Sequence, residues 1–218
     1  MEENVIIEKC IDFVRESLET DHTGHDWSHI ERVYKLACFI AKKEDGNLFV
    51  ISLASLLHDI KDHKFTGGDS LVGATIAYDF LMSLNVSEDI ALAVKDIILN
   101  MSYKCGLNKE KVLSKEGQIV QDADRLDAMG AIGIARTFTY GGSKERVMYD
   151  PDIKPQTYKD IQSYLKSEST TINHFYEKLL KLKELMNTET AKMIAKKRHN
   201  FMESYLNQFY LEWDAIEG

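Results

Sequence analysis

Apolar residues recur at three- and four-residue spacing along most of the chain, and few segments alternate apolar and polar positions with a period of two. The longer spacing places apolar side chains on one face of an α-helix, which predicts an all-α protein. Both prolines fall in one short stretch, residues 149–156, and glycine-containing stretches separate the periodic segments. We expect helices at about residues 4–18, 26–43, 48–58, 70–84, 88–101, 118–139, 157–186 and 188–213.

The segment at residues 48–58 is apolar on nearly all sides, so we expect it at the centre of the core. It leads directly into two polar residues, His58 and Asp59. Polar groups without partners at the buried end of an apolar helix cost free energy. The sequence therefore predicts that both side chains have partners at this point.

The chain has 218 residues, which is enough for one large domain. We expect a single domain over residues 1–218, with its motif-bearing core at about residues 20–140. A C-terminal antiparallel helical hairpin should occupy about residues 156–215, with its turn at Asn187 and with Thr188 as the N-cap of its second helix. This hairpin either packs on the core or forms the interface of a homodimer.

The formal net charge of −8 argues against a nucleic-acid-binding surface, and the basic stretch at residues 191–200 is typical of a solvated helix face. No apolar run approaches the roughly 20 residues that span a bilayer. The acidic N-terminus lacks the apolar region of a signal peptide, and the three cysteines show no CxxC spacing. These features predict a cytoplasmic protein that binds neither nucleic acid nor membrane.

Four polar side chains stand on different predicted helices or helix ends, in mostly apolar surroundings: His29, His58, Asp59 and Asp124. His29 by itself is typical of a core histidine with a hydrogen-bond partner. Together with the other three it favours a metal site, because imidazole and carboxylate groups suit Mn²⁺, Fe²⁺, Mg²⁺ or Zn²⁺. The histidines with no motif around them are expected at the surface: His22, His174 and His199.

The order of these groups is H…HD…D, with "LLHDI" at residues 56–60 and "DADRLDAMG" at residues 122–130. This pattern resembles the HD-domain superfamily of metal-dependent phosphohydrolases. The stretch "GHDWSHIERVYKLA" at residues 24–37 is similar to the G-H-D-x-x-H-x-x-R-V signature of a branch of small, stand-alone bacterial HD hydrolases. The resemblance covers about residues 24–137 and implies an HD-domain helical bundle.

The resemblance implies that four side chains bind one divalent ion: His29, His58, Asp59 and Asp124. It favours Mn²⁺ or Mg²⁺ as this ion, and Fe²⁺, Zn²⁺ or Ni²⁺ are the options. The A-D-x-L pattern of the family selects Asp124, within "ADRL", over its acidic neighbours. Asp127 lies three residues on, near the same helix face, and is the reserve ligand. Asp122 should point elsewhere.

Asp62 follows the HD pair by about one helical turn. The alarmone-hydrolase relatives carry a Glu-Asp pair in this region, whereas this chain has Asp62 and His63, which argues against alarmone specificity. Asp62 is the candidate general base or water-orienting carboxylate, with helix capping or support of the metal ligands as the alternative. Lys64 can meet a phosphate as a point charge. His25 and Asp26 either contact a phosphate or simply cap the next helix.

The resemblance implies an enzyme that hydrolyses a nucleotide through a metal-activated water. The favoured reaction splits a nucleoside or deoxynucleoside triphosphate into monophosphate and pyrophosphate. A nucleoside monophosphate phosphatase is the alternative enzyme. The alternative outside enzymes is a non-catalytic sensor of a nucleotide or a metal with the same fold. The intact ligand set, together with Asp62 and Lys64, favours an enzyme.

Overall fold

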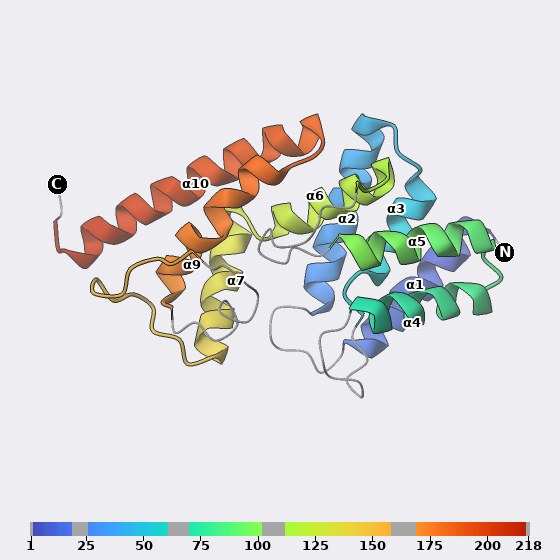
Figure 1. The fold of residues 1–218 in the computed structure, drawn as a ribbon, viewed down its shortest axis with the longest axis horizontal. Helices are drawn as coiled ribbons and strands as arrows, with labels where there is room; N and C mark the ends of the chain where they lie inside the picture. The colour runs from blue at the N-terminus through green and yellow to red at the C-terminus, as the bar shows by residue number, and fades with distance from the viewer. Residues whose placement is uncertain (1, 19–25, 61–69, 102–111, 158–168, 217–218) are drawn as a thin grey trace. The chain divides into compact units, whose positions relative to one another are not determined.

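The structure, a computed structural model, describes residues 2–18, 26–60, 70–101, 112–157 and 169–216. Every regular element within these ranges is a helix, which confirms the predicted all-α class (Figure 1). The elements are α1 (Glu3–Ser17), α2 (Trp27–Glu44), α3 (Leu48–Leu57), α4 (Ser70–Ser83), α5 (Glu88–Asn100), α6 (Lys115–Asp127), α7 (Gly130–Ser143), α9 (Thr171–Glu177), the 3₁₀ helix η1 (Leu179–Leu185) and α10 (Glu189–Trp213).

The chain forms two compact units, Met1–Asp124 and Arg125–Gly218. The expectation of a single domain over residues 1–218 stays a prediction. No helix in the described ranges is both long enough and apolar enough to cross a bilayer.

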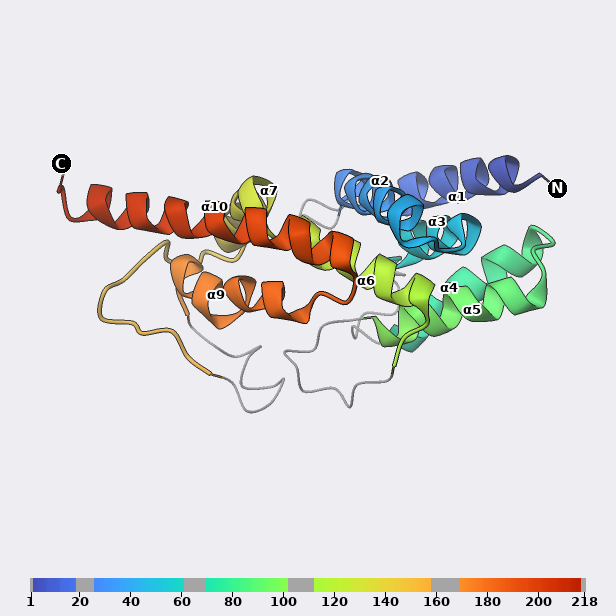
Figure 2. The same cartoon turned by 90° about the horizontal axis from the view of Figure 1, so that it is seen from above.

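Helix α3 is the central helix of the first unit, as the sequence predicted. All of its residues from Phe49 to Leu57 are buried, and α1, α2 and α5 pack against it (Figures 1 and 2). Asn47 fixes its first turn, because its side-chain oxygen accepts hydrogen bonds from the backbone N–H groups of Phe49 and Val50 at 3.1 and 3.2 Å. Each buried aliphatic side chain contributes about 1.5–3 kcal/mol to folding. Helix α3 is therefore a rigid base for the residues that follow it.

In the second unit, α10 packs against α7 and η1 (Figure 1). Thr188 caps α10 as predicted, since its side-chain oxygen accepts a hydrogen bond from Ala191 N–H at 3.2 Å. The core of this unit is built from large side chains that are almost fully buried: Ile172, Phe175, Leu179, Leu182, Met202 and Leu206.

The prediction of one helix at residues 118–139 is wrong, because the chain breaks between α6 and α7. Gly130 has a backbone φ of +71°, a conformation that disfavours any side chain, and an added Cβ there would lie 3.0 Å from Cγ of Arg198. A Cβ at Gly133 would clash with the carbonyl oxygen of Ala128. The two glycines therefore permit a tight turn that the apolar periodicity does not reveal.

The prediction of one long helix at residues 157–186 is also wrong within the described residues, and residues 158–168 lie outside them. Thr170 starts α9, because its hydroxyl accepts a hydrogen bond from Asn173 N–H at 3.1 Å. Lys178 then departs from helical geometry, with φ −136° and ψ −60°. Leu179 and Leu182 are buried at a three-residue spacing, which suits the 3₁₀ helix that follows.

Two of the histidines expected at the surface lie deeper. His199 is only 8% exposed, and its Nε2 atom is 3.3 Å from a carboxylate oxygen of Glu203, so the expectation for it is wrong. His174 is half-buried in α9. His22 lies outside the described residues. Both corrections arise in the second unit, where the sequence-based helix boundaries were also inaccurate.

Two cysteines are described, and both are free. Cys10 is fully buried, and burial raises the pKa of its thiol to about 12. Cys38 is half-buried, with its sulfur 3.7 Å from the hydroxyl of Ser52. Cys105 lies outside the described residues. Burial limits the access of reagents to the thiol of Cys10.

Candidate metal centre

His58 stands at the C-terminal end of α3, directly after its buried residues. Its Nδ1 atom lies 2.9 Å from the carbonyl oxygen of Ser55, one turn earlier on the same helix. When one nitrogen of a neutral imidazole carries the proton and donates it to a carbonyl, the other nitrogen keeps its lone pair. This contact therefore leaves Nε2 of His58, on the side of Asp124, as an acceptor. The carbonyl end of a helix also favours positive charge nearby.

His29 lies in the first turn of α2, and its side chain is 2% exposed. The backbone N–H of His29 donates to the side chain of Asp26 at 3.0 Å. Asp26 therefore caps α2, which is one of the two roles that the sequence left open for it. The rings of His29 and His58 meet edge to face, with their centroids 5.3 Å apart. The first turn of α2 and the C-terminal end of α3 thus bring the two imidazoles together.

Asp124 comes from α6 and faces both histidines. Its Oδ1 atom lies 3.5 Å from Nε2 of His29 and 3.8 Å from Nε2 of His58, and its side chain is 34% exposed. Its acidic neighbours are placed differently. Asp127 accepts a hydrogen bond from Nη1 of Arg136 at 2.7 Å, and Asp122 is fully buried. The geometry therefore favours Asp124 over both of them.

Asp59 follows His58 and completes the cluster. Each of His29, His58 and Asp59 offers one ligand atom, and these three atoms lie within 4.8 Å of one another. Donors held about 2.0–2.3 Å from one cation stand roughly 3–4.5 Å apart, so atoms within this limit are close enough to share a divalent ion after small adjustments. Three nitrogen and carboxylate donors with Asp124 beside them thus form a group that could hold a metal, and two imidazoles favour a transition metal over Ca²⁺.

The charges around His58 favour a cation at this point. Burial lowers the pKa of its imidazole, but the negative charges of the nearby Asp124 and Asp59 carboxylates outweigh burial, so the pKa lies above its ordinary value. The two carboxylates therefore stabilise positive charge beside the imidazole.

Three residues predicted from the sequence lie outside the described residues: His25, Asp62 and Lys64. Their predicted roles in catalysis and substrate binding stay predictions. Sequence reasoning missed Ser55, whose carbonyl orients the ring of His58. Its position three residues before a candidate ligand at a helix end is the signal that could have found it.

Comparison with known proteins agrees with this geometry. The sequence pattern of the HD domain matches residues 26–129. The YpgQ protein of Bacillus subtilis is 38% identical over 207 residues, which cover 94% of this chain and 93% of that protein. Its crystal structure in complex with ADP has a TM-score of 0.76 and covers 97% of each chain at 36% identity.

Two further crystal structures are similar over almost the whole chain. A protein from Lactobacillus plantarum has a TM-score of 0.86 at 40% identity and covers 99% of this chain and 100% of its own. An HD-superfamily hydrolase from Bacillus thuringiensis has a TM-score of 0.77 at 46% identity and covers 98% of this chain and 100% of its own. With the HD-domain match and the cluster of His29, His58 and Asp59, these similarities show that the chain belongs to the HD-domain superfamily of metal-dependent phosphohydrolases.

Proposed function

We propose that this phosphohydrolase acts on nucleotides and splits nucleoside or deoxynucleoside triphosphates into monophosphate and pyrophosphate. The observation that carries the proposal is the convergence of His29 and His58 on Asp124, with Asp59 in the same cluster. The ADP bound to the YpgQ protein supports a nucleotide as the ligand of this related chain.

We assign His29, His58, Asp59 and Asp124 as the ligands of one divalent ion. The resemblance to the family favours Mn²⁺ or Mg²⁺, and the two imidazoles of the donor set also suit Fe²⁺, Zn²⁺ or Ni²⁺. When bound, the ion supplies Lewis-acid polarisation of a phosphoryl oxygen and makes water a stronger nucleophile. The contact of His58 Nδ1 with the carbonyl of Ser55 keeps the ring in the orientation that a ligand needs.

In the proposed reaction, a water oxygen forms a bond to the α-phosphorus, and the bond from that phosphorus to the α–β bridging oxygen breaks. The monophosphate keeps the water oxygen, and pyrophosphate leaves. Asp62 accepts the proton of the water or orients it. Lys64 and His25 hold the phosphates, since cationic or donor groups stabilise the charge that develops on them.

The products of a nucleotide panel test this proposal. The purified protein, loaded with Mn²⁺, is incubated with nucleoside triphosphates and monophosphates, and pyrophosphate and orthophosphate are measured separately. The proposal expects pyrophosphate and monophosphate in equal amounts from triphosphates. Orthophosphate from monophosphates would instead support the phosphatase alternative. No product from any nucleotide would support the sensor alternative.

Asp124→Asn and Asp127→Asn form a matched pair for this assay, because both carboxylates lie on α6 three residues apart. Asp124→Asn should abolish pyrophosphate release. Asp127→Asn should retain activity at a temperature at which the variant is folded.

A further inference from the structure

A stretch in the middle of the second unit is strongly basic in an otherwise acidic chain. Residues 178–200 contain seven lysines and arginines against two glutamates, whereas the whole chain has a net charge of −8. Such a local excess of positive charge attracts anions to one part of the surface. The sequence alone suggested only a solvated helix face here, because it did not show which of these side chains lie together.

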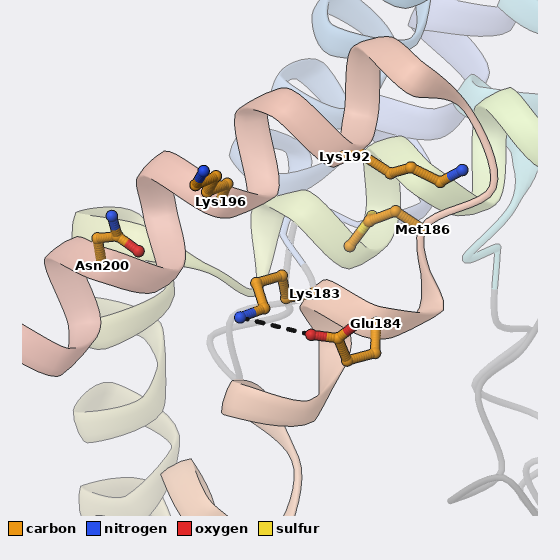
Figure 3. Close-up of a pocket in the computed structure, with 6 residues that line it drawn as sticks. All are labelled: Lys183, Glu184, Met186, Lys192, Lys196 and Asn200. Atoms are coloured by element: carbon orange, nitrogen blue, oxygen red, sulfur yellow. Dashed lines mark ion pairs between the residues drawn. The ribbon is translucent and has the colours of Figure 1, made fainter.

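The structure brings several of these side chains around one pocket of about 330 Å³. The pocket lies between η1 with the turn after it and the first half of α10, so it belongs entirely to the second unit (Figure 3). Six residues line it: Lys183, Glu184, Met186, Lys192, Lys196 and Asn200. Lys192, Lys196 and Asn200 follow one another at four-residue spacing, which places them on one face of α10.

The existing ion pairs of these lysines are weak enough to be exchanged. Lys183 Nζ lies 3.4 Å from Glu184, and Lys192 Nζ lies 2.7 Å from Glu189. The two carboxylate side chains are 76% and 80% exposed, and exposed ion pairs of this kind contribute about 0–1 kcal/mol. Lys196 has no ion pair with any residue that the structure describes. An anion can therefore reach Lys183 and Lys196 by exchanging at most the exposed pair of Lys183 with Glu184.

We propose that this pocket binds a small phosphate-bearing anion of the pyrophosphate class. Each lysine offers three N–H donors, and the amide of Asn200 offers two more, so several phosphoryl oxygens can be satisfied together. A ligand with more than one negative charge gains from lysines on two segments, and here Lys183 stands on η1 whereas Lys192 and Lys196 stand on α10. The volume is at the lower end of the range for small-molecule sites, which favours a compact anion. The net charge of −8 disfavours a nucleic acid.

Isothermal titration calorimetry of the full-length protein with inorganic pyrophosphate tests this proposal. EDTA in the buffer removes divalent ions, so that a metal at the other site does not contribute. The double variant Lys183→Ala/Lys196→Ala removes one lysine from each wall of the pocket. The control, Lys181→Ala/Lys197→Ala, removes two exposed lysines from the same segments that do not line the pocket. Both variants change the net charge of the protein equally.

The pocket variant should raise the Kd for pyrophosphate at least about tenfold, and the control by less than about threefold. Circular dichroism and thermal unfolding of both variants confirm that the fold is intact. Equal weakening in the two variants would overturn the proposal, because it would indicate diffuse attraction by the basic segment. Absence of binding to the wild-type protein would overturn it as well. Neither result bears on nucleotide hydrolysis at the metal centre, which the nucleotide panel tests separately.

Discussion

Nε2 of His29 lies 3.5 Å from Oδ1 of Asp124, although the two residues belong to α2 and α6. His58 comes to the same carboxylate oxygen from the end of α3. Three helices therefore have to be in place before the cluster exists. A cation that binds only the assembled cluster stabilises the folded state, because it has no equivalent site in the unfolded chain.

Divalent metal should therefore raise the thermal stability of the protein. At a Mn²⁺ concentration about 100 times the Kd, binding adds about 2.7 kcal/mol, which corresponds to an increase in Tm of about 5–10 °C for a chain of this size. Differential scanning calorimetry with Mn²⁺ and then with excess EDTA measures the change. An equal increase in Asp124→Ala would show that the metal stabilises the chain through some other site.

Asp127 should be important for stability, although it is not assigned as a ligand. It is 3% exposed and pairs with Arg136 at 2.7 Å. Removal of one partner from a buried pair leaves an uncompensated charge, so Asp127→Ala should lose about 3–5 kcal/mol of unfolding free energy in urea titrations. The control Glu31→Ala breaks the more exposed pair with Lys35 and should cost less than about 1 kcal/mol. Similar losses in the two variants would contradict this account of Asp127.

Two glycines of α7 should respond oppositely to alanine. Gly130→Ala forces a side chain onto a backbone φ of +71° and against Arg198, which should cost about 1–2 kcal/mol. An added Cβ at Gly142 meets no atom within 4 Å, so Gly142→Ala should be neutral or stabilising by up to about 1 kcal/mol. Chemical denaturation of both variants and of wild type measures the two changes in unfolding free energy. A neutral Gly130→Ala would contradict the tight-turn explanation for the break between α6 and α7.

His174 should make the protein less stable in mild acid. Burial and the nearby charges of Lys178 and Arg146 lower the pKa of its imidazole from 6.5 to about 3. Between these values the unfolded state binds a proton that the folded state does not bind, so stability falls as the pH drops below 6.5.

The variant His174→Gln should remove this dependence. Between pH 7.5 and pH 5, wild type should lose about 2 kcal/mol more unfolding free energy than the variant. Urea titrations at the two pH values measure the difference. A parallel loss in both proteins would show that other groups are responsible.

Much of the first unit could be predicted from the sequence. The apolar run before His58 predicted the buried position of α3, and capping residues such as Asn47 and Asp26 act locally, within two or three residues. The order of the histidine and aspartate motifs indicated which side chains should meet. The structure indeed brings His29 and His58 together with Asp124.

The second unit was harder to predict, because contacts distant in sequence determine its local structure. At the break between α6 and α7, Gly130 is closely approached by the side chain of Arg198, which is far away along the chain. The guanidinium of Arg198 also donates to the carbonyl oxygen of Leu126, in the last turn of α6. The pocket beside Lys196 likewise requires two segments to pack together. Periodicity describes the faces of single helices and contains none of this information.

The most direct test of the metal centre is the metal content of purified variants. Wild type, His58→Ala, Asp59→Ala and Asp124→Ala are loaded with Mn²⁺, dialysed and measured by elemental analysis, with circular dichroism to verify folding. His174→Ala is the control, because its histidine lies in the second unit. We predict one bound ion per chain in wild type and in His174→Ala, and a loss of most of the metal in the other three. Full metal content in folded His58→Ala and Asp59→Ala proteins would contradict the assignment of this site.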